Sequence, residues 1–500
     1  MPTKEGLPYA LYRAEQVRKF DALAINEYQI SGQTLMGRAG QAAFELLRNA
    51  WPEAKRIVVV TGSGNNAGDG YCVALLALQV GLEVRVLELA ERERLTSDAA
   101  YYAAEYIDAG GKCTDFENLP VDCDVIIDAI LGTGLNSDVR GTWATAIQAI
   151  NRHKAGVLAL DIPSGLHADR GTVMGIAVEA DYTISFIGLK QGLFTGRARD
   201  YCGEIHFHAL DIPARIYSSE ILACRRIDWQ KLKQRLTNRS RTAHKGDFGH
   251  VLVVGGNRGF SGAARLCGEA ALRSGAGLVS VATHPFHAAV LNAGRPELMV
   301  HAVESSSDLQ ELISRASVIV AGPGLGQDTW AVELLDTVLQ SGKRTVLDAD
   351  ALNLLASGAV TLPGQGEYVV SPHPGEAARL LQTDVSAVET DRFAAVSQLS
   401  QQLQVSAVLK GAGTLIATQS GKPVAVCSEG NPGMASGGLG DVLAGLLGTF
   451  LAQNEDTDEA VCLAVSLHAA AADVEAQQGE SGLLASDLFE HVRRLLNDAC

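Results

Sequence analysis

The chain has 500 residues, of which 47% are hydrophobic and 20% are charged, and this composition excludes wholesale disorder. Its length exceeds that of one ordinary domain of roughly 100–200 residues and predicts two or more domains. The formal net charge of −16 makes nucleic acid or an anionic membrane surface an unfavourable partner.

The sequence shows neither membrane-targeting signals nor a pattern of disulfide-forming cysteines. No apolar run reaches the roughly 18 residues that a membrane helix needs, and the first residues lack a secretory signal pattern. The nine cysteines are scattered without a C-x-x-C pair, which favours reduced thiols over disulfides or a zinc site. We therefore expect a cytoplasmic protein that binds neither membrane nor nucleic acid, and we expect it to form a homo-oligomer.

The first half of the chain alternates predicted strands with predicted helices. Apolar, β-branched runs predict strands at residues 56–61, 83–89, 124–129 and 156–161. Helices are expected at residues 13–28, 70–80, 97–109 and 142–152. This alternation is typical of a parallel sheet with right-handed crossovers and helices on both faces.

The same pattern begins again in the second half, which predicts a second α/β layer structure. Strands are expected at residues 250–254, 277–282, 317–321, 345–348, 368–371 and 407–410. We place the boundary at about residues 216–229, between domains at residues 1–220 and 226–500. The basic run at residues 225–247 is interpreted as a solvated surface, with phosphate binding as the alternative.

A glycine-rich segment and two aspartates mark the expected carboxyl edge of the first sheet. The segment TGSGNNAGDG at residues 61–70 follows a strand, where backbone N–H groups can hold an anion. Asp128 ends one predicted strand, before the turn LGTGL, and Asp161 ends the next, within DIPSG. These elements should converge, because the carboxyl ends of parallel strands form a ligand crevice. A plain strand–helix turn and helix N-caps are the structural alternatives.

Three side chains near these turns carry oxygen atoms of the kind that hard cations prefer. They are Asn66, Asp128 and Ser164.

The motifs NNAGDG, DAILGTGL and DIPSGL, in this order and spacing, resemble the NAD(P)H-hydrate epimerase domain over roughly residues 10–215. The resemblance implies a Rossmann-like fold, a substrate that is hydrated NADH or NADPH, and K⁺ held by the three oxygen-bearing side chains just named. It also implies that Asp161 is the acid/base that interconverts the R and S hydrates. The implied substrate contacts are Asn65, Asn66, Ala67, Gly68, Asp69, Gly132, Thr133, Gly134, Leu135, Asn136, Ser137 and Asp138, with Trp143 as a variable contact after this loop.

A second glycine-rich segment, NPGMASGGLGD at residues 431–441, precedes an apolar helical run. Glycines at a helix start can aim several N–H groups at one phosphate-sized anion. Asp441 beside them is placed to activate a hydroxyl or water, and a helix N-cap is the structural alternative. The G-x-G-D element that Asp441 ends is the signature of ribokinase-like proteins. Four further turns, GGNRGFSG, GPGLG, SPHPGE and KGAGT, follow predicted strands, and the last supplies a lysine suited to phosphate.

These turns, together with HKGDFGHVLVVGG and LDADALN, resemble the nucleotide-dependent (S)-NAD(P)H-hydrate dehydratase over about residues 226–496. The resemblance implies a ribokinase-like α/β fold in which Asp441 removes the hydroxyl proton during phosphoryl transfer and Mg²⁺ neutralises charge. Epimerase followed by dehydratase resembles the bacterial type, which uses ADP and yields AMP and phosphate. The implied contacts are Ala263, Gly324 and His373 with the hydrate, and Lys410, Gly411, Ala412, Gly413, Thr414 and Gly440 with the nucleotide.

Two other interpretations stay open. The G-x-G-D element also permits a ribokinase-like small-molecule kinase, which makes a stable phosphorylated product. The first half is then a noncatalytic nucleotide-binding module fused to it, although Asp128 and Asp161 argue against that assignment. A redox dehydrogenase is disfavoured, because the G-x-G-x-x-G dinucleotide fingerprint is missing.

Overall fold

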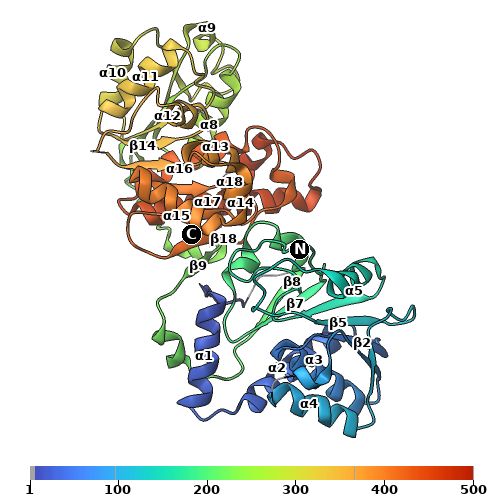
Figure 1. Cartoon of the computed structure of the whole chain (residues 1–500). Coiled ribbons are helices and arrows are strands. Elements are labelled where there is room, and N and C mark those ends of the chain that lie inside the picture. The colour runs from blue at the N-terminus through green and yellow to red at the C-terminus, as the bar shows by residue number, and fades with distance from the viewer. Residues whose placement is uncertain (1–5, 96, 365, 499–500) are drawn as a thin grey trace. The chain divides into compact units, whose positions relative to one another are not determined.

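The computed structural model describes residues 6–95, 97–364 and 366–498 (Figure 1). The chain divides into two compact units, Met1–Arg225 and Arg226–Cys500. Each unit is an α/β structure built on a mainly parallel sheet, as expected from the alternation of strands and helices. Among the helices of the described ranges, none has both the length and the apolar character that a membrane crossing requires.

The first unit contains a fully parallel, seven-stranded sheet in the order β4-β3-β2-β5-β6-β7-β8. Its strands are β2 (Arg56–Thr61), β3 (Glu83–Glu88), β4 (Lys112–Asp115), β5 (Val125–Ala129), β6 (Gly156–Leu160), β7 (Tyr182–Phe186) and β8 (Glu204–His208). Four of them match the predicted strands. No pattern predicted β4 or β7, whereas the alternation of His206 and His208 indicates a strand, which is β8. The outermost strands, β4 and β8, carry polar or half-buried residues.

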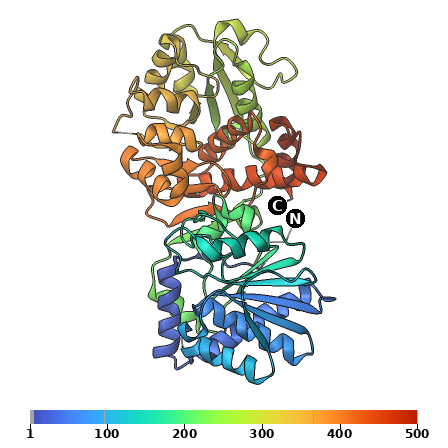
Figure 2. The ribbon, with the colours of Figure 1, turned by 45° about the vertical axis from the view of Figure 1, so that its right-hand side comes forward.

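Helices cover both faces of this sheet (Figure 2). One face packs against α1 (Ala14–Asn26), α2 (Gly32–Ala50), α3 (Asn65–Gln79) and α4 (Ser97–Asp108), and the other against α5 (Gly141–Arg152). Alternation along β2 explains the two layers: Val59 belongs to the first core, whereas Val58 and Val60 pack with Ile147 of α5.

The glycine-rich segment after β2 is helical sooner than expected, because α3 begins at Asn65 rather than near residue 70. Its glycines serve close packing. A Cβ on Gly68 would lie 2.8 Å from the Cα of Ala99, and a Cβ on Gly70 would lie 2.5 Å from the Cβ of Ala129. The motif therefore fixes the position of α3 against α4 and β5, in addition to leaving N–H groups at the helix start.

The second unit orders the strands that lie wholly within it as β18-β17-β16-β15-β14-β13-β10-β11-β12. They are β10 (His250–Val254), β11 (Leu278–Thr283), β12 (Met299–Ala302), β13 (Val318–Ala321), β14 (Arg344–Leu347), β15 (Tyr368–Val370), β16 (Ser406–Leu409), β17 (Leu415–Ala417) and β18 (Val424–Cys427). The pairings from β12 to β16 are parallel, and β16, β17 and β18 pair antiparallel. The six predicted strands are all present.

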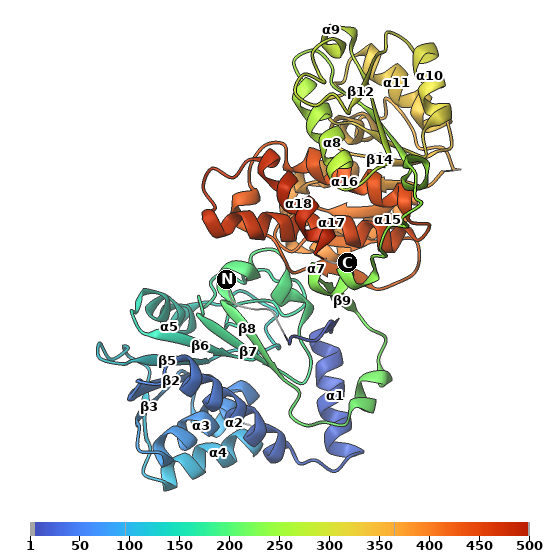
Figure 3. The same ribbon diagram turned by 180° about the vertical axis from the view of Figure 1, so that it is seen from behind.

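A layer of four helices lies together on one face of this sheet (Figure 3). They are α8 (Ser261–Arg273), α16 (Leu439–Gln453), α17 (Thr457–Glu475) and α18 (Leu488–Asn497). The other longer helices are α10 (Ser306–Arg315), α11 (Thr329–Gln340), α12 (Asp350–Ala356), α13 (Pro374–Leu380) and α15 (Arg392–Leu403). Helix α16 is buried along nearly its whole length, which explains why its sequence is apolar on all sides.

Besides the 3-10 turns, six short strands and helices remain in the described ranges. They are β1 (Ala10–Leu11), β9 (Cys224–Ile227), α6 (Ala198–Tyr201), α7 (Trp229–Leu232), α9 (Pro285–Ala288) and α14 (Val385–Thr390). Strand β1 pairs antiparallel with the start of β9, with Ala10 opposite Arg225.

Candidate active sites

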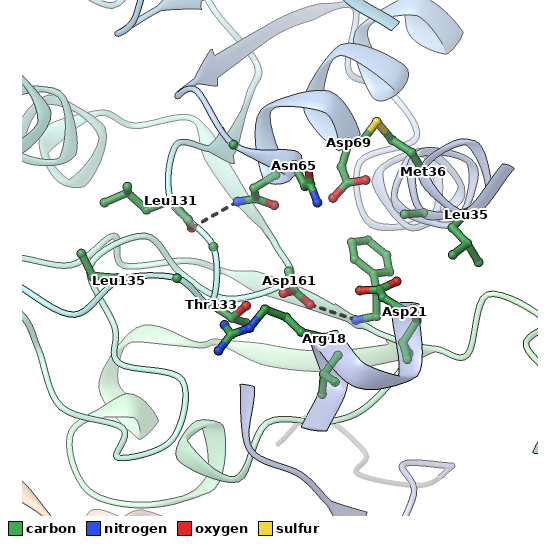
Figure 4. A pocket seen from close by; sticks show the side chains of 18 of the residues that line it. Arg18, Asp21, Leu35, Met36, Asn65, Asp69, Leu131, Thr133, Leu135 and Asp161 are labelled. Atoms are coloured by element: carbon green, nitrogen blue, oxygen red, sulfur yellow. Dashed lines mark hydrogen bonds between the residues drawn. The ribbon is translucent and has the colours of Figure 1, made fainter. Parts of the chain in front are cut away.

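A cavity of about 770 Å³ opens at the carboxyl ends of the strands in the first unit (Figure 4). Eleven of the residues named from the sequence line it: Asn65, Asn66, Asp69, Gly132, Thr133, Gly134, Leu135, Asn136, Ser137, Trp143 and Asp161. Three others do not: Ala67 and Gly68 are buried within α3, and Asp138 is exposed beside Arg140. Asp128 and Ser164 lie beneath the cavity and are fully buried.

Asp161 follows β6 directly and has a left-handed backbone, with φ of +66°. Its backbone N–H donates to the carbonyl of Ile184 at 2.7 Å, and its Oδ1 accepts from the N–H of Phe186 at 3.2 Å. Both partners belong to β7, so the neighbouring strand holds this aspartate at the cavity wall. Left-handed non-glycine residues held in this way are a feature of functional sites.

Lys190 is the principal functional candidate that the sequence analysis missed. Its Nζ donates to the carboxylate of Asp161, to Ser185 Oγ at 3.1 Å and to the carbonyl of Phe186 at 3.1 Å. Its side chain is only 1% exposed. The ammonium therefore uses its three donors within the protein and holds the Asp161 carboxylate in place. It stands in the plain sequence GLKQG, where nothing marks it as functional.

Two further carboxyl groups face the same cavity. Burial, followed by repulsion from Asp161, raises the pKa of Asp21 to about 6. The same two causes, in the same order, raise the pKa of Asp69 well above its usual range. Figure 4 shows that Asp21 comes from α1 and Asp69 from α3. Burial and mutual repulsion therefore favour the protonated form of Asp21 and Asp69 beside the Asp161–Lys190 pair.

Oxygen atoms gather under the loop after β5. Asp128 accepts hydrogen bonds from Ser164 Oγ at 2.6 Å and from Ser164 N at 2.7 Å. Asn66 Nδ2 donates to the carbonyl of Leu131 at 3.2 Å, which leaves Asn66 Oδ1 buried and without a hydrogen-bond partner among the described residues. Buried polar atoms are rarely left unpaired. A carboxylate, a hydroxyl, a carbonyl and an unpaired amide oxygen therefore fit a hard monovalent cation such as K⁺.

In the second unit, Asp441 stands in the first turn of α16. Gly438 precedes this helix with φ of +92°, a conformation that suits glycine and turns the chain into the helix start. Burial, together with repulsion from Asp348, raises the pKa of Asp441 to about 7. A carboxylate with a pKa near neutrality is well matched to removing a proton from a hydroxyl group.

Lys410 lies beside Asp441 and the start of α16. Its Nζ donates to Asp348 Oδ1 at 2.7 Å and lies 3.8 Å from Glu376 Oε2. Burial lowers the pKa of Lys410, but attraction to Asp348 and Glu376 outweighs burial and raises it overall. A Cβ on Gly440 would lie 3.4 Å from Lys410 Nζ, so the bare backbone of Gly440 borders this cation. The predicted nucleotide residues thus come together from two distant segments.

Arg392 supports the lysine-bearing loop from behind. Its guanidinium is 1% exposed and donates through Nη2 to the carbonyl of Lys410 at 3.0 Å and through Nη1 to Glu389 at 2.8 Å. A Cβ on Gly411, which has φ of +129°, would lie 3.0 Å from Nη2. The loop therefore requires glycine at this position for two reasons, backbone conformation and space. No motif pointed to Arg392, because it lies in α15 far from the glycine-rich turns.

The residues predicted to contact the hydrate fall in two places. A Cβ on Gly324 would lie 3.2 Å from the Cβ of Ala263, so these two residues are neighbours. His373 begins α13, where its Nδ1 accepts from the N–H of Gly375 at 3.0 Å and its own N–H donates to Glu376 at 2.8 Å. Burial, followed by Lys410, lowers the pKa of His373. His373 is thereby held neutral and fixed in orientation.

Carboxylates suitable for Mg²⁺ also lie here. In the described ranges no three His, Cys, Asp or Glu side chains converge into a complete protein metal site. Mg²⁺, however, is usually bound by one or two carboxylates together with substrate phosphates. Asp348 and Glu376, which flank Lys410, fit that pattern when a nucleotide supplies the remaining oxygen ligands.

Each half of the chain matches a known protein family. A family model described as YjeF-related protein N-terminus matches residues 32–192, and one described as NAD(P)H-hydrate dehydratase matches residues 251–494. A ribokinase-like superfamily protein from Enterococcus faecalis V583, of solved structure, is 31% identical with a TM-score of 0.52, over 56% of this chain and 98% of that one. It confirms the ribokinase-like fold of the second unit.

Two relatives match almost from end to end. The bifunctional NAD(P)H-hydrate repair enzyme Nnr of Coxiella burnetii is 44% identical over 97% of this chain and 99% of its own. The protein of the same name from Escherichia coli K12 is 42% identical over 98% of this chain and 95% of its own. Both relatives therefore align with the first half and the second half of this chain in a single match. The chain belongs to the family of bifunctional NAD(P)H-hydrate repair enzymes, with an epimerase-type half followed by a dehydratase half.

Proposed function

We propose that residues 1–220 interconvert the R and S hydrates of NADH and NADPH, and that residues 226–500 dehydrate the S hydrate at the expense of ADP. One observation carries this proposal: each unit places a buried or half-buried aspartate beside a lysine at the carboxyl edge of its own parallel sheet. Asp161 forms an ion pair with Lys190, and Asp441 lies near Lys410, whose own hydrogen-bond partner is Asp348.

Epimerisation requires the hydroxyl group at the hydrated ring carbon to leave and to return on the other face. The lone pair of the ring nitrogen expels the hydroxyl as water once it has received a proton, and water then adds to the opposite face and loses a proton. Asp161 takes and returns protons at this oxygen, while Lys190 balances its charge. The residues of the Asn65–Asp69 and Gly132–Asp138 segments that line the cavity contact the substrate, together with Trp143: Asn65, Asn66, Asp69, Gly132, Thr133, Gly134, Leu135, Asn136 and Ser137.

K⁺ would be held by Asn66, Asp128 and Ser164, and its positive charge would fix the loop after β5. Ser164 Oγ already accepts from the N–H of Leu131 at 2.7 Å, so this loop and the oxygen cluster are one connected structure. The loop itself forms a wall of the cavity.

Dehydration needs a better leaving group than hydroxide. Asp441 removes the hydroxyl proton as the terminal phosphoryl group of ADP transfers to the hydroxyl oxygen, which releases AMP. The ring nitrogen then expels phosphate, and loss of a proton from the adjacent carbon restores the reduced nicotinamide. Hydrate and ADP thereby give NAD(P)H, AMP and phosphate. The nucleotide is bound by the Lys410–Thr414 loop and Gly440, and the hydrate by Ala263, Gly324 and His373.

The Mg²⁺ that Asp348 and Glu376 would hold supplies charge neutralisation for the transferring phosphoryl group. The protein adds the amide groups at the start of α16, whose helix dipole favours negative charge. Neither contribution depends on a basic surface, which agrees with the net charge of −16.

A single incubation tests the proposal. The full chain is mixed with both hydrates and with ADP or ATP, the two hydrates are separated chromatographically, and phosphate and NAD(P)H are measured. We expect both hydrates to disappear, phosphate and NAD(P)H to form in equal amounts, and ADP to serve better than ATP. A stable phosphorylated product without NAD(P)H would favour the kinase interpretation instead, and persistence of the R hydrate would show that the first unit is not an epimerase.

A further inference from the structure

The cavity of the first unit has an unusual distribution of charge for a site that takes an anionic dinucleotide. Among the described residues that line it, four are carboxylic acids and two are cations. The acids are Asp21, Asp69, Asp98 and Asp161, and the cations are Arg18 and Lys190. Carboxylates repel phosphate, so the position of each cation decides where phosphate can bind.

Lys190 is not available for a phosphate. It is 1% exposed, and its Nζ donates to Asp161, Ser185 and Phe186. Its charge is balanced by the carboxylate of the reacting centre. Lys190 therefore belongs to the acid/base machinery of the cavity and not to the binding of the substrate's anionic part.

Arg18 is in the opposite situation. It lies on α1, exposed to solvent, and it makes no hydrogen bond or ion pair within the described residues. Its neighbours Val17 and Phe20 are buried in the core, which fixes the helix and presents Arg18 at the cavity. Figure 4 shows the side chain reaching from α1 into the cavity, toward the loop that carries Thr133. Arg18 is thus a free guanidinium that faces a ligand site.

The opposite wall carries backbone donors. Helix α3 begins at Asn65 after Gly64, which has no side chain to cap the first N–H groups, and both residues line the cavity. The loop of residues 132–137 lies beside them, and nothing within 4 Å would contact a Cβ on Gly134. A phosphate between these walls would meet amide N–H groups on one side and a guanidinium on the other.

We propose that Arg18 binds a phosphate group of the hydrated dinucleotide and so anchors the substrate while its ring lies at Asp161. This inference rests on the proposed epimerase function. The planar guanidinium suits two phosphate oxygens at once, and it offsets the negative charge of the surrounding acids. The bound group is either the diphosphate, which both substrates contain, or the 2′-phosphate, which only the NADPH hydrate contains.

The experiment measures epimerisation alone, in the full chain and without ADP or ATP, so that the dehydratase lacks its phosphoryl donor. Arg18→Gln and Arg18→Lys are compared with the wild type on the R hydrates of NADH and NADPH separately. Lys19→Gln is the matched control, because Lys19 is an adjacent exposed cation on the same helix that does not line the cavity.

We expect Arg18→Gln to lower kcat/KM by on the order of 10- to 100-fold, mainly by raising KM, as for loss of a charge-assisted hydrogen bond. Arg18→Lys keeps the charge and should recover part of the loss, and the effect should weaken at high salt. An equal loss on both hydrates assigns the diphosphate, and a loss confined to the NADPH hydrate assigns the 2′-phosphate.

Unchanged kinetics of Arg18→Gln on both hydrates, beside an active wild type, would overturn the inference. An equal effect of Lys19→Gln would also overturn it, because the cause would then be general surface charge. A wild type that fails to epimerise contradicts the proposed function instead, so the two failures are distinct. Thermal unfolding of the first unit, compared with the wild type, confirms that each variant is folded, and ADP-dependent dehydration of the S hydrate by the second unit checks that the preparations contain equal amounts of protein.

Discussion

Lys190 donates a hydrogen bond to the carboxylate of Asp161, 29 residues earlier in the chain, at the point where β6 and β7 end side by side. The lysine is almost fully buried, so removing either partner leaves an uncompensated charge in the core. The pair therefore links the chemistry of the first unit to its stability.

Asp161→Asn should abolish epimerisation, with a loss of about 10²–10⁴-fold, because the amide neither takes nor returns a proton. Dehydration of the S hydrate should continue at the wild-type rate, and the R hydrate should accumulate. Chromatography of the two hydrates during turnover measures both effects. If the variant consumes the R hydrate as fast as the wild type does, Asp161 is not the acid/base.

Lys190→Met should also slow epimerisation, by on the order of 100-fold, and it should destabilise the first unit by about 3–5 kcal/mol, since Asp161 loses its partner. The double variant Asp161→Asn with Lys190→Met should be more stable than Lys190→Met alone, because no unpaired charge remains. Denaturant unfolding of the wild type, the two single variants and the double variant gives the coupling free energy between Asp161 and Lys190. Additive effects of the two substitutions would show that the ion pair is energetically unimportant.

Asp441→Asn should abolish ADP-dependent dehydration and leave epimerisation intact. In the wild type, kcat/KM for dehydration should fall about tenfold per pH unit below pH 7 and level off above it, because the base is protonated below its pKa of about 7. Phosphate release at a series of pH values measures the profile. A flat profile between pH 5 and pH 8 would contradict a role for this carboxylate as the base.

The same pKa predicts a change in stability. Burial raises the pKa of Asp441 from 3.8 to about 7, so the folded state favours the protonated form, and stability is lost as pH rises through this interval. Asp441→Asn removes that loss. The variant should gain on the order of 2 kcal/mol over the wild type by pH 8 and little at pH 4. Calorimetry of the second unit's transition at the two pH values checks this, and a gain of equal size at both would be inconsistent with it.

Gly440→Ala should raise the KM for ADP at least tenfold, because the added methyl group would stand 3.4 Å from Lys410 Nζ, where the nucleotide phosphates bind. Gly437→Ala is the control, since nothing within 4 Å would meet its Cβ and it lies in the same turn. Initial rates at varied ADP concentration separate KM from kcat. Equal effects of the two substitutions would show that the turn, and not the phosphate position, is sensitive.

Epimerisation should be faster in KCl than in an equal concentration of tetramethylammonium chloride, an ion too large for the oxygen cluster. Asn66→Ala removes the unpaired amide oxygen and should raise the K⁺ concentration needed for half-maximal activation by on the order of tenfold. Dehydration, assayed in the same buffers, controls for general salt effects. Indifference of the wild-type epimerase to K⁺ would exclude this assignment.

Sequence patterns predicted the elements that lie at strand ends. Asp161 and the turn at residues 131–135 follow apolar strands, and parallel topology then forces them to one edge of a sheet, whereas Asp441 is marked by the glycines before an apolar helix. Such residues are predictable, because the period of two along a strand and the glycines after it are local signals. The family motifs named the same positions.

The missed residues lack a local signal. Arg18 and Asp21 stand on an amphipathic helix, where charged residues ordinarily indicate solvent, and only the packing of α1 brings them to the cavity. Arg392 lies within α15, and its burial depends on a loop 18 residues away. Conversely, Gly68 looked like part of an anion loop but is a packing position against Ala99. The roles of these residues depend on contacts between segments that are far apart in the sequence, which local patterns do not reveal.

The chain passes from the first unit to the second only once, after Arg225, so each unit is one continuous stretch of sequence. Each molecule synthesised therefore carries one copy of each proposed activity, whatever the level of expression. A cell that makes this protein therefore holds the epimerising unit and the dehydrating unit at a one-to-one ratio. The stereochemistry of the damage then has little bearing on how much cofactor is recovered.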